Sequence, residues 1–397
     1  MPQAAAPAPV RATLGGEIIG SSTLTIWSLP SAERLRRLLQ RAGATAGDGA
    51  ARCLLLRADW VYDEVLVKSL ARRDADCVLV GGDGQCVAAS VGMARVPAVR
   101  ELLAHGEAPA DIPRLDAAQL AGNYNDALRK REPPFLLPLT AASQRDIEAR
   151  VFKGSYKGVT DFVTLYFWPR PAAVFTGWCA RLGISPNMVT SLSLVCVLAA
   201  MWCFWHGHYG WGLASAWFMT FLDTVDGKLA RVTVQSSRLG HWLDHGMDIV
   251  HPPIWYVLWA QGLGGALDDG TRQLMIALIV GGYLAGRALE GLFHALGPCS
   301  LFAWRPFDAY FRLVTARRNP CLIIMTVALL FGRADWALYG VAWWTAGSSA
   351  LMALRLCYAL VERLRHGPLT SWLTDPAAAE NHPRAYRTFA GTRGAYA

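Results

Sequence analysis

Hydrophobic residues follow two different patterns along this chain, and the first pattern ends near residue 150. In that part the apolar residues form short runs at Leu54–Leu56, Cys77–Val80 and Cys86–Val91, which predict β-strands. Apolar residues of Glu64–Arg73 have helical spacing, and the glycines of Gly81–Gly84 predict a tight turn between the last two strands. The order strand, helix, strand, hairpin predicts a small soluble α/β domain over residues 1–150.

The second pattern begins at Val189, where long apolar runs follow one another in quick succession. A helix needs about 20 residues to cross the hydrocarbon core of a bilayer. The runs predict six transmembrane helices, at Val189–Trp205, Tyr209–Arg231, Gly240–Gln261, Gln273–Leu296, Pro320–Phe331 and Trp336–Ala359. We therefore expect a multi-pass α-helical membrane domain over residues 151–366, followed by a polar tail over residues 367–397.

Basic residues alternate between the segments that connect these runs. They are frequent before the first run, between the second and third, before the fifth and after the sixth, at Lys153, Lys157, Arg170, Arg181, Arg231, Arg238, Arg305–Arg318 and Arg363–Arg365. The other connections carry few. Because basic loops stay on the cytoplasmic side, we expect an integral protein of a bacterial inner membrane with both termini and the active site in the cytoplasm.

Composition narrows the class of protein further. Charged residues make up 17% of the 397 residues and hydrophobic residues 53%, whereas a soluble domain usually has about 25% charged residues. This excludes a disordered, collagenous or coiled-coil chain. The net charge of +8 would favour binding to nucleic acid or to an anionic membrane surface. Because the chain is also strongly hydrophobic, the membrane is the better interpretation. We therefore expect no nucleic-acid partner. The nine cysteines have neither zinc-site spacing nor the pattern of a disulfide framework.

Four carboxylates lie where the second predicted helix ends and the third begins. Asp223 and Asp226 are three residues apart, and Asp244 and Asp248 are four apart, so each pair lies on one face of its helix. The short connection makes the two helices antiparallel neighbours. We therefore expect the four carboxylates to converge at the cytoplasmic edge of the membrane.

Unpaired carboxylates at that depth are costly and usually functional. Oxygen ligands of this kind suit Mg²⁺ or Mn²⁺ bound together with a phosphate-bearing substrate, and Lys228 and Arg231 are candidate phosphate partners. The structural alternative is a cluster of ion pairs in which the acids only neutralise Lys228, Arg231 and Arg238. That alternative leaves the glycines of the same stretch, Gly227 and Gly240, without a role.

The spacing Asp223-x2-Asp226-Gly227-x2-Ala230-Arg231-x8-Gly240-x3-Asp244-x3-Asp248 resembles the signature of the CDP-alcohol phosphatidyltransferase family. The resemblance extends over about Val151 to Arg365, since the family also has six helices and a Pro-Asn-x2-Thr element before the first. Here that element is Pro186-Asn187-Met188-Val189-Thr190, which also has the composition of a helix start.

The resemblance implies a transfer without a covalent enzyme intermediate. Asp223, Asp226, Asp244 and Asp248 would hold Mg²⁺ or Mn²⁺, with two ions expected, and Asp248 would be the general base. The CDP part of the donor would be bound by Asp226, Gly227, Ala230, Arg231 and Gly240. A homodimer is expected by the same analogy.

A second group of charges lies further along the chain. Arg287 and Glu290 stand three residues apart in the fourth predicted helix, and Arg317 and Arg318 precede the fifth. Arg287 with Glu290 is either a self-satisfied bridge or part of a cavity that recognises an acceptor phosphate. Arg287, Arg317 and Arg318 are the candidate acceptor-binding residues. The two arginines before the fifth helix serve equally well as interfacial anchors, and Lys153 and Lys157 are weaker candidates.

The front domain followed by such a membrane domain resembles the bifunctional inositol-phosphate cytidylyltransferase/di-myo-inositol-phosphate-phosphate synthases. Leu54 to Val91 is similar to part of a sugar-nucleotidyltransferase domain, with Asp59 at the strand end where a metal-binding acid is expected. The Gly-rich nucleotide loop of such domains is missing near the N-terminus. We therefore expect a degenerate nucleotidyltransferase-like domain without cytidylyltransferase activity.

The leading hypothesis is transfer of a phosphate-linked alcohol, with CDP-diacylglycerol as the favoured donor, to a polyol or polyol phosphate in phospholipid biosynthesis, with CMP as by-product. An alternative is transfer from a small CDP-alcohol donor to a lipid or polyol phosphate acceptor. A cation transporter is the alternative from another class. It accounts for the acids but not for Gly227, Ala230, Arg231 and Gly240 at their spacing.

Overall fold

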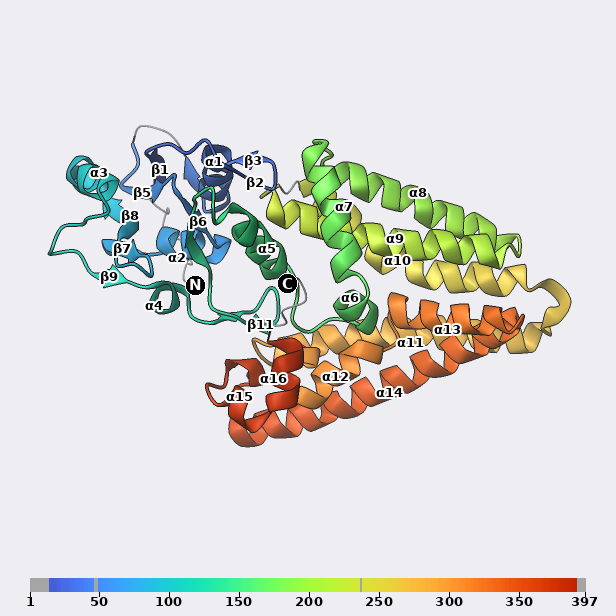
Figure 1. The fold of residues 1–397 in the computed structure, drawn as a ribbon. Helices are drawn as coiled ribbons and strands as arrows, with labels where there is room; N and C mark the ends of the chain where they lie inside the picture. Colours follow the sequence, from blue (N-terminus) through green and yellow to red (C-terminus); the bar gives the residue numbers. More distant parts are fainter. Residues whose placement is uncertain (1–13, 46–48, 236–237, 391–397) are drawn as a thin grey trace, which may run out of the picture. The chain divides into compact units, whose positions relative to one another are not determined.

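The computed structural model describes residues 14–45, 49–235 and 238–390, with the backbone alone for residues 238, 239, 241 and 243–245. The chain divides into two compact units (Figure 1). Unit 1 comprises residues 1–123 and 133–151, and unit 2 comprises residues 124–132 and 152–397. The chain therefore passes between the units three times, because the short segment 124–132 belongs to unit 2 although unit 1 residues flank it on both sides.

Unit 1 is built on a mixed sheet of six strands in the order β4-β1-β5-β8-β7-β9. β1 is parallel to β4 and to β5, with Leu14 opposite Arg52 and Ile19 opposite Arg57. β5 then pairs antiparallel with β8, β8 pairs antiparallel with β7, and β7 is parallel to β9. The strands are β1 (Leu14–Ile19), β4 (Ala44–Thr45), β5 (Arg52–Arg57), β7 (Cys77–Val80), β8 (Cys86–Gly92) and β9 (Arg114–Leu115).

The predicted elements of the front domain are present in this unit. The strands expected at Leu54–Leu56, Cys77–Val80 and Cys86–Val91 lie in β5, β7 and β8, and the predicted helix is α2 (Glu64–Ala71). Its first turn is capped because the Asp63 side chain accepts a hydrogen bond from the backbone N–H of Val65. The remaining elements of the unit are β2 (Thr25–Ile26), β3 (Leu29–Pro30), α1 (Ser31–Arg41), β6 (Trp60–Tyr62), η1 (Met93–Arg95), α3 (Val96–Ala104), α4 (Ala117–Ala121), β12 (Leu136–Pro138) and most of α5 (Gln144–Gly154).

Unit 2 is a helical bundle preceded by a small hairpin. The hairpin is β10 (Tyr124–Asn125) with β11 (Lys130–Arg131), and two helices, α6 (Phe162–Tyr166) and α7 (Pro169–Arg181), lead into the bundle. The bundle helices are α8 (Pro186–Trp205), α9 (Tyr209–Val232), α10 (Arg238–Gly262), α11 (Asp269–Leu296), α12 (Pro306–Val314), α13 (Arg318–Leu330) and α14 (Ala334–His366). Short elements complete the unit: η2 (Gly264–Ala266), η3 (Leu301–Ala303), η4 (Trp372–Thr374), α15 (Ala378–Asn381) and α16 (Pro383–Phe389).

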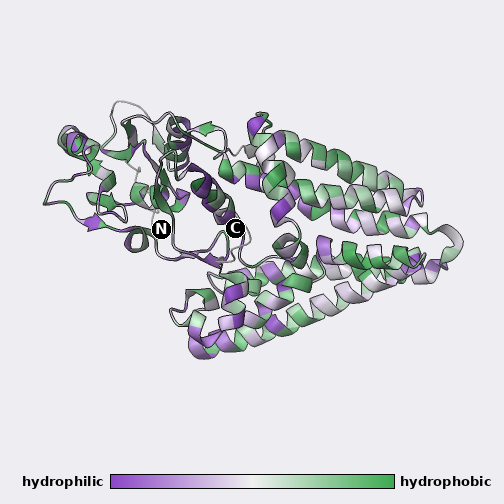
Figure 2. Ribbon diagram, in the orientation of Figure 1, coloured by the Kyte–Doolittle hydropathy of each residue, from purple (hydrophilic) through white to green (hydrophobic). Residues whose placement is uncertain are grey.

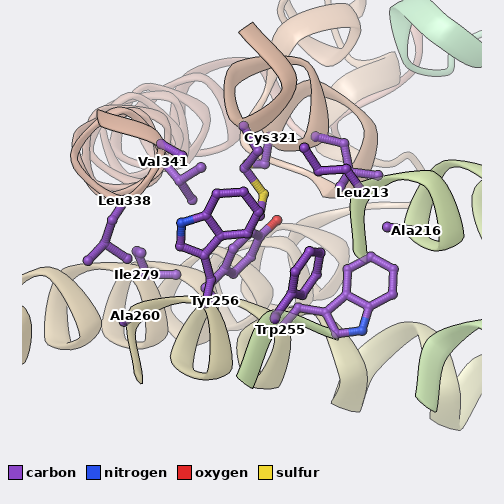
Figure 3. Packing of buried hydrophobic residues seen from close by; sticks show 14 of the residues in the cluster. Leu213, Ala216, Trp255, Tyr256, Ala260, Ile279, Cys321, Leu338 and Val341 are labelled. Atoms are coloured by element: carbon purple, nitrogen blue, oxygen red, sulfur yellow. The ribbon is translucent and has the colours of Figure 1, made fainter. Parts of the chain in front are cut away.

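The bundle packs around a core of buried aromatic and aliphatic side chains. α9 and α10 both pack against α8, and α14 packs along α11 and α13. Leu213 of α9, Trp255 of α10, Ile279 of α11, Cys321 of α13 and Val341 of α14 point toward one another in this core (Figure 3). The core therefore joins the helices α8, α9 and α10 to the helices α11, α13 and α14.

The membrane-spanning prediction is supported in part. Helices occupy all six predicted positions, but in the part of the chain that the structure describes only α8, α11 and α14 are long and apolar enough to cross a membrane. α12 and α13 form a fourth span if they are one helix bent by 43°. α9 and α10 fall short because they carry the charged motif residues. Figure 2 shows hydrophobic residues along most of α8 and hydrophilic ones at the C-terminal end of α14.

The units differ from the predicted domains at two places. The segment 124–132 lies in unit 2, not with the front domain. The predicted polar tail does not form a separate part over its described length, because Leu369, Trp372, Leu373 and Phe389 are buried in a cluster that also contains Phe293 of α11. Apolar residues scattered among polar ones conceal this packing in the sequence.

Candidate active site

The first turn of α8 orients one of the four motif carboxylates. α8 begins at Pro186, and the Ser185 side chain accepts a hydrogen bond from the backbone N–H of Met188, which caps the helix. One turn later the Thr190 hydroxyl lies 2.8 Å from Oδ2 of Asp226 on α9. Because Asp226 is only 6% exposed, this contact fixes its carboxylate between two helices. The Pro-Asn-x2-Thr element thus both starts α8 and positions a motif aspartate.

Two further motif carboxylates meet at one cation. The Arg318 guanidinium, at the start of α13, donates from Nη2 to Oδ2 of Asp223 and from Nη1 to Oδ1 of Asp248, each over 2.6 Å. Asp223 lies on α9 and Asp248 on α10. The structure therefore brings these two carboxylates together, and it does so through a residue from a third helix that lies 70 positions beyond Asp248.

The backbone of Asp248 is held in an unusual way. Pro252 and Pro253 stand inside α10, and because proline has no N–H, the carbonyls four residues earlier lose their helical donors. Those carbonyls belong to Asp248 and Ile249. The Tyr283 hydroxyl of α11 lies 3.3 Å from the first and 2.9 Å from the second. Tyr283 thus supplies a donor at the place where the two prolines remove the helical ones.

A cavity of about 290 Å³ opens beside Asp248. Among the residues that the structure describes, its lining includes three acids and six cations: Asp161, Asp248, Glu290, Arg129, Lys157, Arg287, Arg312, Arg317 and Arg318. An excess of positive charge in a recess attracts anions. The cavity is therefore suited to an anionic ligand whose reacting group lies next to Asp248.

The predicted acceptor residues all lie at this cavity. Glu290 forms its ion pair with Arg317, not with Arg287 three residues away. Nε of Arg287 donates to the Tyr283 hydroxyl over 3.3 Å. Arg318 pairs with Asp248 in the cavity wall and with Asp223, which is not among the described lining residues. The self-satisfied bridge between Arg287 and Glu290 is thus not formed, because α13 brings a closer partner to Glu290.

The two basic residues of the motif stretch have different surroundings. Nζ of Lys228 lies 3.3 Å from the centre of the Tyr156 ring and donates to the carbonyl of Ser155 over 3.2 Å. Lys228 is buried there, which corrects its prediction as a phosphate partner. The Arg231 guanidinium folds over Gly227, where a Cβ would lie 3.0 Å from Nη2. Gly227 thus leaves room for the Arg231 side chain itself.

Some predicted site residues are placed only by their position in a helix. Ala230 lies on α9, and Gly240 lies in the first turn of α10. The Asp244 side chain lies outside the described residues. Lys153 lies on α5, and Lys157 lies at the cavity, in the loop that follows.

The chemistry of the carboxylates fits a divalent cation. Asp223 and Asp248 already reach a common positive group, and oxygen-only donors are what Mg²⁺ and Mn²⁺ prefer. Oδ2 of Asp226 accepts a hydrogen bond from the Thr190 hydroxyl. Within the described part of the chain, no three His, Cys, Asp or Glu side chains are gathered to hold a metal.

In unit 1, Asp59, which follows the end of β5, forms an ion pair with Arg57. Arg57 donates from Nε to Oδ1 of Asp59 over 3.0 Å and from Nη2 to Oδ2 over 2.6 Å. This contact raises the pKa of the Arg57 guanidinium. A metal at Asp59 would have to displace this bidentate pair.

Comparison with known proteins indicates the class of protein that the bundle resembles. Residues 183–289, from just before α8 to the middle of α11, match the family model described as CDP-alcohol phosphatidyltransferase. Over these residues the chain is similar to that family. The match contains the whole aspartate motif and ends before the cations of α12 and α13.

Individual relatives share the same region. The chain is 33% identical over 102 residues to the phosphatidylinositol phosphate synthase of Streptomyces avermitilis, which covers 25% of this chain and 42% of that protein. The synthase of the same name from Mycobacteroides abscessus is 31% identical over 104 residues, or 25% of this chain and 45% of the relative. Choline/ethanolaminephosphotransferase 2 of Arabidopsis thaliana is 32% identical over 121 residues, covering 25% of this chain and 28% of the relative. The chain thus spans less than half the length of these relatives.

Several cavity and supporting residues were not predicted from the sequence. They are Tyr283, Arg129, Arg312 and Asp161, whereas Thr190 belongs to the Pro-Asn-x2-Thr element that the sequence already indicated. The paired prolines were the one local signal, since they imply unsatisfied carbonyls at Asp248 and Ile249. The other residues come from segments far away in the chain, and their local sequence does not predict the contact.

Proposed function

We propose that this protein transfers a phosphate-linked alcohol from a CDP-alcohol to the hydroxyl group of a second compound and releases CMP. The favoured donor is CDP-diacylglycerol, and the favoured acceptor is a polyol or polyol phosphate, which makes the reaction a step of phospholipid biosynthesis. The similarity of residues 183–289 to the family supports the reaction class. The similarity to bacterial phosphatidylinositol phosphate synthases supports a polyol phosphate as the acceptor.

One observation carries the proposal. Asp248 belongs both to the carboxylate pair bridged by Arg318 and to the wall of the basic cavity. A hydroxyl compound bound in the cavity would therefore lie beside a carboxylate at hydrogen-bonding reach, which is what a general base requires. Its phosphate would lie among the arginines, to which phosphate binds strongly.

The bond changes follow from this arrangement. The acceptor hydroxyl oxygen attacks the phosphorus that bears the alcohol, and the bond from that phosphorus to the oxygen of the CMP group breaks. The hydroxyl proton passes to the Asp248 carboxylate, and CMP leaves. Asp223, Asp226, Asp244 and Asp248 would hold Mg²⁺ or Mn²⁺, which when bound neutralises charge on the diphosphate. Arg231, one helical turn after Gly227 on α9, would bind that diphosphate.

The test is CMP release by the purified full chain in detergent with CDP-diacylglycerol, Mg²⁺ or Mn²⁺, and a panel of polyols and polyol phosphates. We expect release that depends on the acceptor and is lost with EDTA. Asp248→Asn should lower the rate at least about 100-fold, because a positioned general base contributes that much. Asp269→Asn is the matched control, since Asp269 is 86% exposed and pairs only with Arg272 on its own helix.

Two results would contradict the proposal. Normal turnover by the Asp248→Asn variant would show that Asp248 is not the base. Absence of CMP release with every acceptor would direct the assay to small CDP-alcohols with lipid acceptors, the alternative that the name of the plant relative favours.

A cation transporter remains the second candidate by class, because it also uses intramembrane acids. It is disfavoured by the family match and by the bridging of Asp223 and Asp248 by Arg318. Uptake of ²²Na⁺ or Mn²⁺ into proteoliposomes, without any CMP release, would support a transporter instead.

A further inference from the structure

The cations of the cavity come from two parts of unit 2. Arg287 and Arg317 lie on α11 and at the start of α13, and they are the residues expected to receive one acceptor phosphate. Arg129 lies in the hairpin, Lys157 lies in the loop before α6, and Arg312 lies on α12. All three lie outside the residues that match the family model. They form a second group, called here the outer cations.

Two of the outer cations are fixed by their backbone. The N–H of Gly158 donates to the Leu128 carbonyl over 2.9 Å, and the N–H of Val159 donates to the Arg129 carbonyl over 3.3 Å. A Cβ at Gly158 would lie 2.6 Å from the Arg129 carbonyl oxygen and 2.2 Å from that of Phe389. Only glycine permits this close approach. The hairpin and the loop that carries Lys157 are therefore held together, and Arg129 and Lys157 are placed at the cavity by rigid backbone.

The wall of the cavity that holds the outer cations has more basic than acidic side chains. Within the described residues none of the three takes part in an ion pair, and Nη1 of Arg312 is buried without a hydrogen-bond partner. The charge of Asp161, which accepts hydrogen bonds from Asn319 and Thr164, acts on Arg312, that of Asp126 acts on Arg129, and that of Asp223 acts on Lys157. Burial and the charges of Arg129, Arg231 and Arg312 lower the pKa of Lys157. Cations that repel one another in a recess need an anion to neutralise them.

The anion belongs to the acceptor side of the reaction. Asp248, the expected base, lines the cavity, whereas Asp223 and Arg231, expected at the donor, are not among its described lining residues. Arg287 and Arg317, the latter paired with Glu290, are the residues expected to receive one phosphate. We propose that the outer cations form a second anion subsite, and that the acceptor carries two separate anionic groups, such as a polyol bisphosphate or a phosphorylated polyol carboxylate. This inference rests on the proposed function.

The test compares mono- and bisphosphates of the same polyol. Binding of glycerol 1-phosphate, glycerol 1,3-bisphosphate, inositol 1-phosphate and inositol 1,4-bisphosphate to the full chain in detergent is measured by titration calorimetry. We expect the bisphosphate to bind at least about tenfold more tightly than the monophosphate in one of the two series, as one added charge-assisted contact provides. Equal affinities in both series would overturn the inference.

Variants separate the two subsites. Arg129→Gln and Lys157→Gln should each weaken the bisphosphate about tenfold and change the monophosphate less than about twofold. Arg287→Gln should weaken both ligands. Arg170→Gln, on the exposed side of α7, is the charge-matched control and should change neither. If Arg129→Gln weakens the monophosphate as much as the bisphosphate, the cavity has one anion subsite and the inference is wrong.

The same preparations, assayed for CMP release, distinguish this inference from the proposed function. CMP release with a monophosphate, without a preference for any bisphosphate, would overturn the second subsite and leave the reaction intact. A bisphosphate preference with no CMP release from any donor would overturn the role of the cavity as an acceptor site. An unchanged monophosphate affinity in Arg129→Gln also shows that this variant is folded.

Discussion

Asp248 is held at two points, by Arg318 at its carboxylate and by Tyr283 at its backbone carbonyl. The second contact depends on the prolines of α10, which leave that carbonyl without a helical donor. A base that must meet a substrate hydroxyl needs a fixed position, since small displacements of a reacting group are costly. In the proposed mechanism, where Asp248 is the base, Tyr283 would act as a positioning residue for it, from a place in the wall of the same cavity.

Tyr283→Phe should lower kcat about fivefold, because the lost hydrogen bonds contribute about 1 kcal/mol to the position of Asp248. CMP release under saturating substrates measures this. Tyr209→Phe is a matched control: its hydroxyl also lies 3.3 Å from a carbonyl of α10, that of Trp259, but near the other end of the helix. Both variants should lose similar thermal stability, and only Tyr283→Phe should lose activity. Equal kcat values would refute the positioning role.

The sequence allowed the reactive residues of the site to be predicted better than their supports. The spacing of the aspartates was enough to place Asp223 and Asp248 near each other, because helix geometry puts such pairs on one face. Lys228 was misplaced, since the same spacing does not reveal the Tyr156 ring that covers it. Arg318, predicted at the acceptor site, lies at the cavity and also pairs with the motif carboxylates, which the sequence did not indicate. These differences arise from long-range packing, which local sequence does not report.

At the scale of elements, the C-terminal end of α10 packs closely on the end of α8. A Cβ at Gly262 would lie 2.1 Å from the Phe204 carbonyl oxygen and 3.1 Å from the backbone nitrogen of Gly207. Both neighbours are backbone atoms that cannot rotate away. Trp259, on the same turn, donates its indole N–H to the Ala334 carbonyl over 2.9 Å. This end of α10 is thus tied to α8 and to the start of α14.

Gly262→Ala should destabilise the bundle by about 1–3 kcal/mol, because the added methyl group forces the helices apart. The midpoint of thermal unfolding in detergent measures this change. Gly265→Ala provides the control, since a Cβ there meets no atom within 4 Å. If Gly265→Ala lowered the unfolding midpoint more than Gly262→Ala did, the close contact at Gly262 would not limit the stability of the bundle.

The helices were predicted with different success for physical reasons. α8 has a continuous apolar run after a capped start, so both its position and its apolar character were clear. α12 was missed because its amphipathic sequence, with Asp308 and Arg312, does not resemble a membrane span. Asp308 is fully buried by the Arg355 guanidinium of α14, at 2.6 and 2.8 Å. A charge that is neutralised by a distant partner looks exposed when only its neighbours in sequence are considered.

At the scale of the whole molecule, the hairpin before the bundle stabilises the segment after it. Nη1 of Arg131 donates to the carbonyls of Leu373 and Asp375. Nζ of Lys130 donates to the Gly154 carbonyl over 2.7 Å. The two ends of unit 2 are thus joined by residues that precede the bundle and residues that follow it.

A chain that begins at residue 152 should therefore unfold at a lower temperature than the full chain. It loses the hairpin contacts with residues 373–375 and the backbone hydrogen bonds to Gly158 and Val159. Scanning fluorimetry in the same detergent compares the two. The full chain with Arg131→Ala should unfold at an intermediate temperature, because it loses only the side-chain contacts. A truncated chain as stable as the full one would show that the hairpin is dispensable.

The three passages of the chain between its units have a consequence for how such proteins diverge. The hairpin is part of the front half by its place in the gene and part of the bundle by its contacts. A recombination event that exchanged the front halves of two homologues would also exchange Arg129, a residue of the cavity wall. The aspartate motif and the other cavity residues would stay with the bundle, so the descendant would combine Arg129 of one parent with Lys157, Arg287 and Arg312 of the other.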